Sequence, residues 1–170
     1  MTITPTAPGL TFDVAADPLF TVPFNGAQLP TAFNASIRNL GPTADVYSLT
    51  FSNIPAGFSL LASRTSIAIP AGLPGGLGFY LQPDGTQPIP APGTVLSFDV
   101  TAQGTSGQSI TRTVTFTVPA IDAVVVAASP GSVVATPGET VPVAVTITNA
   151  GNVTETIALT ATAPNGLAVT

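Results

Sequence analysis

Two stretches of this sequence match and decide the fold: NASIRNLGPTADVYSLTFSNIPAGFSL at residues 34–60 and VAVTITNAGNVTETIALTATAPNGLAVT at residues 143–170. Their alignment places Asn39 and Asn149 at the same point, 110 residues apart. A period of this length is too long for a solenoid unit and fits a whole β-sandwich domain. We therefore expect two copies of one domain, with the second copy interrupted at Thr170.

The matched positions are turn residues and alternating apolar residues. Asn, Gly and Pro favour tight turns, and apolar residues at every second position point to one face of a strand. We expect the acidic residue after each Asn-x-Gly turn to accept backbone N–H bonds there. The architectural residues are Asn39, Gly41, Asp45, Tyr47, Leu49, Phe51, Pro55 and Gly57 in the first copy, and Asn149, Gly151, Glu155, Ile157, Leu159, Pro164 and Gly166 in the second.

Apolar and polar residues alternate over most of the chain. In TVLSFDVTA, for example, Leu96, Phe98 and Val100 share one face of a strand, whereas Ser97 and Asp99 share the other. This pattern is typical of antiparallel sheets with one buried face, and no stretch has the apolar period of a helix. The sequence predicts strands near 10–16, 19–24, 31–39, 44–53, 57–61, 65–69, 76–82, 94–103 and 109–119, and again near 122–129, 132–136, 140–149, 153–162 and 166–170.

The turn and core residues resemble a known family. The strings RNLGPTADVYSLTFSNIPAGFSL and TNAGNVTETIALTATAPNGLAVT are similar to bacterial immunoglobulin-like modules of the NEW3 and CARDB type. The resemblance implies an all-β, immunoglobulin-like antiparallel β-sandwich of about seven strands. It also implies an array on a secreted or surface-attached bacterial protein, without a shared active site. The first copy departs from the pattern at residues 72–93, where we expect longer loops.

Composition excludes several classes of function. The net charge is −5, with three arginines, no lysine and no histidine. Binding to nucleic acid or to an anionic membrane surface needs a cationic surface, which this chain cannot form. Since the chain has no cysteine, disulfides and thiolate metal sites are excluded as well. Few charges and many Thr, Ser and Asn residues favour an extracellular or cell-surface setting, although the sequence shows no signal-peptide pattern and no stretch long enough to span a membrane.

The pattern of titratable residues does not indicate an enzyme. A Ser-His-Asp triad requires histidine. Asp13 and Asp17 would stand about 13 Å apart on one strand, whereas paired carboxylate catalysis needs roughly 5 to 10 Å. We expect no catalytic residue, no cofactor and no metal; calcium held by Asp17, Asp84 or Asp122 is the alternative to solvated turns.

A glycine-rich motif and a pair of aromatic residues are both explained most simply by the structure of the strands and turns. No Lys-Ser/Thr follows PGGLG, so we expect a turn at Pro74-Gly75-Gly76 and not a phosphate-binding loop. One of Phe79 and Tyr80 must point outward on a regular strand, where it could contact a ligand such as a sugar. There is no Trp, and we expect Tyr47 in the core, so a carbohydrate platform would be weak.

The sequence predicts a leader or linker at residues 1–9, a complete sandwich at 10–119 and an incomplete second sandwich at 120–170. We expect a non-catalytic structural spacer of a larger bacterial protein, whose partners are neighbouring domains of the same polypeptide. The alternatives are a carbohydrate-binding accessory module of a glycosidase and a subunit of a strand-exchanging surface filament. In the filament, another chain would supply the strands that the second copy lacks.

Overall fold

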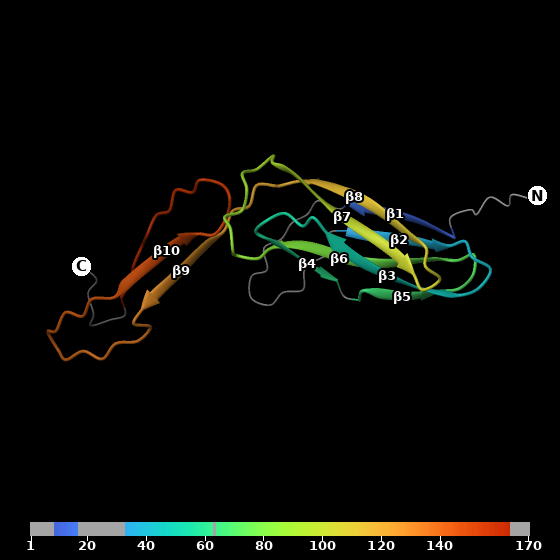
Figure 1. The fold of residues 1–170 in the computed structure, drawn as a ribbon. Coiled ribbons are helices and arrows are strands. Elements are labelled where there is room, and N and C mark those ends of the chain that lie inside the picture. Colours follow the sequence, from blue (N-terminus) through green and yellow to red (C-terminus); the bar gives the residue numbers. More distant parts are fainter. Residues whose placement is uncertain (1–8, 17–32, 63, 164–170) are drawn as a thin grey trace, which may run out of the picture. The chain divides into compact units, whose positions relative to one another are not determined.

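The computed structural model describes residues 9–16, 33–62 and 64–163. The chain divides into two compact units, Met1–Ile121 and Asp122–Thr170, two residues beyond the division that the sequence suggested. The prediction of an all-β chain is confirmed for the described residues, which contain strands and no helix (Figure 1). The predicted strands at 19–24 and 166–170 lie outside the described ranges, as do Pro164 and Gly166.

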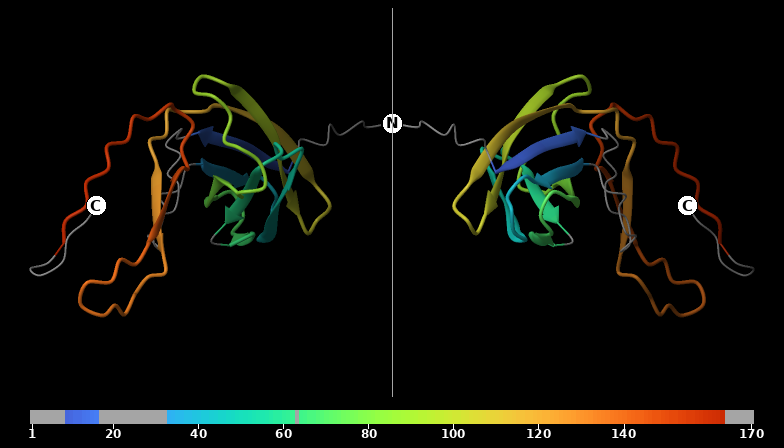
Figure 2. Two further views of the ribbon diagram at one scale, coloured as in Figure 1. Left: turned by 90° about the vertical axis from the view of Figure 1, so that its left-hand side faces the viewer. Right: turned by 90° about the vertical axis from the view of Figure 1, so that its right-hand side faces the viewer.

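The first unit is a sandwich of two antiparallel sheets that face each other (Figures 1 and 2). One sheet has the order β1-β2-β6-β4 and the other the order β5-β3-β7-β8. The strands are β1 (Leu10–Ala16), β2 (Phe33–Asn39), β3 (Asp45–Ser52), β4 (Phe58–Ala62), β5 (Ser66–Ile69), β6 (Pro74–Pro83), β7 (Val95–Gly104) and β8 (Ser109–Thr117).

This strand order is that of an immunoglobulin-like sandwich. Constant-type domains have the sheets A-B-E-D and C-F-G. The first of these sheets corresponds here to β1-β2-β6-β4, and the second corresponds to β3-β7-β8. The remaining strand, β5, pairs with β3 at the edge of its sheet. The first unit is therefore an all-β immunoglobulin-like sandwich with one additional edge strand.

Alternation along the strands builds the core between the sheets. In β2, Phe33, Ala35 and Ile37 are buried, whereas the residues between them are exposed. The ring of Phe33 stacks on that of Phe79, with a centroid distance of 5.2 Å, and meets that of Phe98 edge-on at 5.3 Å. Such ring pairs contribute about 0.5–1.5 kcal/mol each beyond the burial of their area.

The glycine-rich segment is a strand, so the predicted turn at residues 74–76 is wrong. Gly75 stands opposite Ile37 in the pairing of β2 with β6. A Cβ atom on Gly75 would lie 2.7 Å from Cδ1 of Ile69 and 3.2 Å from Cδ1 of Ile67. The absence of a side chain therefore lets the β5 isoleucines pack over β6, which a glycine count along the sequence cannot reveal.

The second unit contains, among its described residues, two antiparallel strands: β9 (Val124–Ser129) and β10 (Ala144–Asn149). The predicted strands at 132–136 and 153–162 are wrong, because the structure has no strand in either range. In the first unit, β3 is held by hydrogen bonds to β5 and β7. No described strand of the second unit takes those places, so residues 153–162 have no strand partner within the described ranges.

Candidate functional site

The candidate site lies at the end of the first unit where β2 turns into β3. Asn39 is the fourth inward-facing residue of β2, and only 1% of its surface is exposed. Its Nδ2 donates to the carbonyl oxygens of Thr43 (2.8 Å) and Ile69 (2.9 Å), and its Oδ1 accepts the N–H of Gly41 (2.8 Å). A polar side chain at a core position is thus fully hydrogen-bonded, as burial requires.

Asp45, at the start of β3, holds the hairpin between β7 and β8. Its carboxylate accepts the hydroxyl of Thr105 and, at 2.6 Å, the hydroxyl of Ser106. It accepts the N–H of Ser106 at 3.4 Å. It also accepts the backbone N–H of Val46, next to the Asn-x-Gly turn, at 2.8 Å. This bond agrees with the predicted role of Asp45 as an acceptor of backbone N–H groups beside the turn, whereas its hydroxyl partners in the hairpin were not predicted. The hydrogen bonds from the side chains of Ser106 and then Thr105 stabilise the charged form and lower the pKa of Asp45 to about 2.

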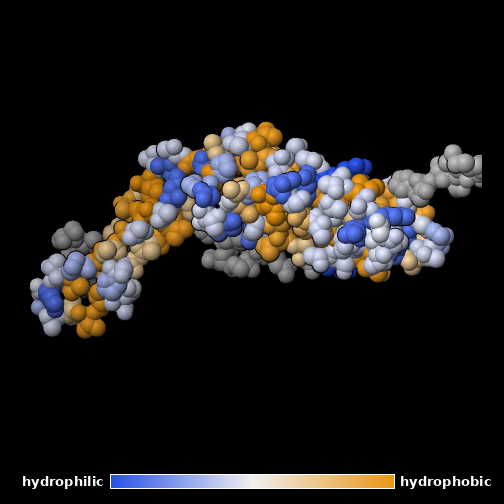
Figure 3. Space-filling view, in the orientation of Figure 1, coloured by the Kyte–Doolittle hydropathy of each residue, from blue (hydrophilic) through white to orange (hydrophobic). Residues whose placement is uncertain are grey.

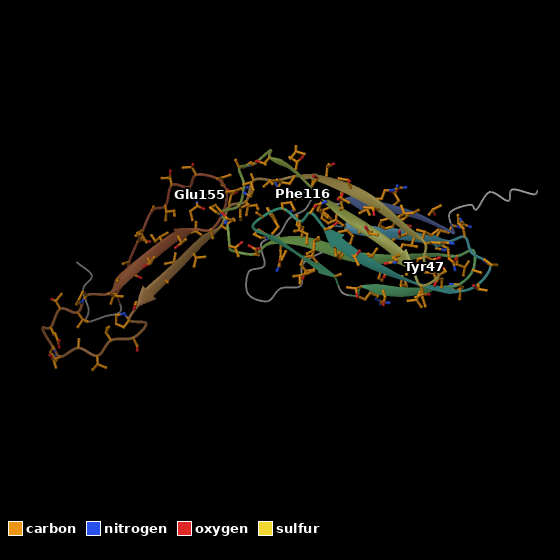
Figure 4. The ribbon with its side chains drawn as sticks, in the orientation of Figure 1. Tyr47, Phe116 and Glu155 are labelled. Atoms are coloured by element: carbon orange, nitrogen blue, oxygen red, sulfur yellow. The ribbon has the colours of Figure 1, made fainter. Side chains whose placement is uncertain are left out.

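Tyr47 closes the same end of the core, as predicted, with 1% of its surface exposed (Figure 4). It stands opposite Gly104 in the pairing of β3 with β7. A Cβ atom on Gly104 would lie 3.0 Å from Cε1 of Tyr47 and 2.6 Å from Oδ2 of Asp45. Burial, and secondarily the charge of Asp45, raise the pKa of Tyr47, so the phenol stays protonated at neutral pH.

These groups line an open hollow of about 310 Å³ between the turn and the hairpin. Gly9, Gln108 and residues 41–44 complete its wall. Its chemistry is that of amides, hydroxyls and one carboxylate. A general base works best with a pKa near the operating pH, and Asp45 is far below that range. The hollow can accept and donate hydrogen bonds, but its described residues offer no activated nucleophile.

The other architectural residues of the first copy lie along and beyond β3. Leu49 is buried, and Phe51 is half-buried against Phe79, with ring centroids 4.9 Å apart. Pro55 and Gly57 form the turn that follows the far end of β3. The N–H of Phe58 donates a hydrogen bond to the carbonyl of Pro55 at 3.2 Å and closes this turn. Gly57 has a φ of 83°, a backbone conformation that favours glycine.

The second unit repeats the Asn-x-Gly hydrogen bonds. The Nδ2 of Asn149 donates to the carbonyl of Val153 at 2.7 Å, and its Oδ1 accepts the N–H of Gly151 at 2.9 Å. These bonds span the same sequence separations as the Thr43 and Gly41 bonds of Asn39. Asn149 differs in being exposed.

The side chain of Glu155, which is labelled in Figure 4, shares a hydrogen bond with that of Asp122, and this bond is the main cause that raises the pKa of Glu155. The role of Glu155 as an acceptor of backbone N–H bonds at the turn stays a prediction. Ile157 and Leu159 are 40% and 64% exposed, so they do not form a core as Tyr47 and Leu49 do.

The structure places the predicted ligand residues as follows. Phe79 is in the core with 1% exposure, so it cannot contact a ligand, and only Tyr80 faces outward, half-buried on β6. Asp84 accepts hydrogen bonds from the N–H and hydroxyl of Thr86. Within the described ranges, no three His, Cys, Asp or Glu side chains gather as a metal site requires; Asp17 lies outside those ranges.

Sequence reasoning missed the partners of two carboxylates. Asp45 meets Thr105 and Ser106 about sixty residues later, and Asp99 accepts hydrogen bonds from Asn53 (2.7 Å) and Thr113 (2.6 Å). The Thr113 bond follows from the β7–β8 hairpin, because Asp99 and Thr113 are directly paired. The other contacts depend on how β3 meets β7, for which the sequence holds no local signal.

The chain has few counterparts among known proteins in the comparisons made. No protein-family model and no curated protein matches the chain. Among solved structures, the chain is similar to the crystal structure of a FixG-related protein from Vibrio parahaemolyticus, with 15% identity and a TM-score of 0.48 over 66% of this chain and 98% of that one. A likeness this distant carries no inference about function. Among the described residues, no helix is long and apolar enough to cross a membrane.

Replacing Asn39 tests its role in the core. Asn39→Ala removes the three hydrogen bonds of the buried amide, to Ile69, Thr43 and Gly41, which we expect to cost about 2–3 kcal/mol of unfolding free energy. Both tyrosines of the chain, Tyr47 and Tyr80, belong to the first unit, so tyrosine fluorescence during urea unfolding reports on that unit. The matched control Asn149→Ala should leave this transition unchanged. Equal transitions for Asn39→Ala and the unsubstituted chain would contradict the role.

Asp45→Asn tests the electrostatic part of the site. Because the folded pKa of Asp45 lies below the ordinary value of 3.8, its charge stabilises the folded state above pH 4, and this contribution is lost as the pH falls towards 2. We expect Asp45→Asn to lower the unfolding free energy at pH 6 by about 1 kcal/mol, after allowance for screening by water. The stabilities of the two proteins should converge near pH 2. A difference that is independent of pH would refute the assignment.

Proposed function

We propose that the chain is a non-catalytic structural module of a tandem immunoglobulin-like array in a larger bacterial secreted or cell-surface protein. The resemblance to NEW3 and CARDB modules and the low-charge, Thr-rich composition support this proposal. The hollow beside Asn39 adds no chemistry that would favour an enzyme. The role is mechanical: rigid domains in series hold another part of the protein at a distance.

The observation that carries the proposal is the matched pair of Asn turns. Asn39 and Asn149 each bond to the residues two and four positions later. The strands before these turns also pair alike, since Asn39 stands opposite Leu10 and Asn149 opposite Val124. A shared register and a shared turn support the inference that the second unit begins another copy of the sandwich, which makes the chain part of an array.

The short junction and the ends of the first sandwich suit a spacer. Residues 118–123 separate β8 from β9, and a short linker that contains Pro119 restricts motion between neighbours. Force along the chain would enter the first unit through β1 and leave it through β8. These strands lie against each other, and Nε of Arg112 on β8 donates to the carbonyl of Phe12 on β1 at 3.2 Å.

Stretching single molecules by their two ends tests this function. We expect the first unit to resist force and then unfold in one step, with a gain in contour length of about 35 nm from its roughly 110 residues. Arg112→Gln removes the bridge between the end strands and should lower the unfolding force. Thr115→Ala, on the outer face of the same strand, is the matched control. Gradual extension without a step would contradict a mechanical role.

A further inference from the structure

The outer edge of β10 has no strand neighbour within the described part of the chain. The second unit contains the two-stranded sheet β9-β10. The corresponding strand of the first unit, β2, has β1 on one side and β6 on the other. An open edge exposes a row of N–H and C=O groups, and these groups are a template for another strand.

The first unit shows which backbone groups of β10 face this edge. The N–H of Asn39 donates to the carbonyl of Leu73, and its C=O accepts the N–H of Gly72; both partners lie on the β6 side. The N–H of the next residue, Leu40, donates to the carbonyl of Gly9 on the β1 side. The N–H of Ala150 likewise bonds to Ala123, on the β9 side. Because the direction alternates along a strand, the backbone groups of Asn149, Ile147 and Val145 face the open edge. Those of Thr148 and Thr146 face β9.

One face of the same sheet is apolar and uncovered. Val124, Val126 and Val145 are 38%, 60% and 50% exposed. Their counterparts in the register of β1 and β2 are fully buried; these are Leu10, Phe12 and Ala35, at 1%, 2% and 0%. Figure 3 shows hydrophobic surface gathered on the second unit. An edge whose amides have no strand partner among the described residues, beside an apolar face, fits a polypeptide strand, because a lipid would offer these amides no hydrogen-bond partners.

We propose that the edge of β10 binds an extended polypeptide segment with the side-chain pattern of β6, antiparallel to β10. In the first unit, Gly75 stands opposite Ile37 and Leu77 opposite Ala35. The same register places a small residue opposite Ile147 and a large apolar residue opposite Val145. The inference rests on the proposed repeat, but stretching of the first unit does not depend on it, so either can fail alone.

A synthetic peptide with the sequence of residues 70–83, PAGLPGGLGFYLQP, is the probe. It contains β6 and the residues that bond to Asn39. Backbone hydrogen exchange is measured by NMR on the 170-residue chain with and without the peptide. At a concentration that fills nine-tenths of the sites, the amides of Val145, Ile147 and Asn149 should exchange about tenfold more slowly. Those of Thr146 and Thr148 should change little, because β9 already protects them.

Ile147→Pro is the matched variant. It removes an N–H that faces the open edge and leaves the β9 side intact, since proline is tolerated at a sheet edge. The peptide should lose its effect on this variant, while Thr146 and Thr148 keep their protection. A peptide of the same composition without the alternation should have no effect on either protein.

Three results would overturn the proposal. One is no slowing of exchange at millimolar peptide. The second is exchange at Val145, Ile147 and Asn149 that is already slow without peptide. The third is concentration-dependent dimerisation in light scattering that protects these amides, which would make a second copy the occupant.

Discussion

The buried amide of Asn39 is the interaction on which the first unit depends. It joins the end of one sheet to the other, because Asn39 belongs to β2 and its partner Ile69 belongs to β5. Its other bonds shape the turn along which the chain crosses between the sheets. The backbone of the same residue pairs with Gly72 and Leu73, where the chain returns from β5 to β6. One residue thus contacts two crossings, the first through its side chain and the second through its backbone, and apolar packing fills the space between them.

The two units show what this amide requires from its surroundings. Asn149 makes the turn bonds of Asn39, so the local sequence is sufficient for the turn. It lacks a counterpart to the bond with Ile69 among the described residues, and it is exposed. The turn is therefore a local structure, whereas the burial of the amide depends on strands that arrive later in the chain. The apolar residues that follow show the same dependence, since Tyr47 is buried and Ile157 is not.

Much of the fold could be predicted from the sequence, because a strand with one buried face leaves a period of two. Strands β1, β2, β3 and β7 and the burial of Tyr47 follow from that period. Prediction from this period failed where a contact between segments far apart in the sequence decides the structure. Gly75 lies in β6, where its missing side chain leaves room for Ile69, and Asp45 bonds to Ser106 as well as to the backbone beside its own turn. Neither neighbour is visible from the local sequence.

The exchange of side-chain amide protons tests the central claim most directly. In NMR spectra of the folded chain, both Nδ2 protons of Asn39 should exchange at least about 100-fold more slowly than those of Asn34, because one is donated to the buried carbonyl of Ile69 and the other to the partly buried carbonyl of Thr43. Asn34 lies on the exposed face of the same strand and serves as the reference. Exchange of the Asn39 amide at the rate of Asn34 would contradict the account.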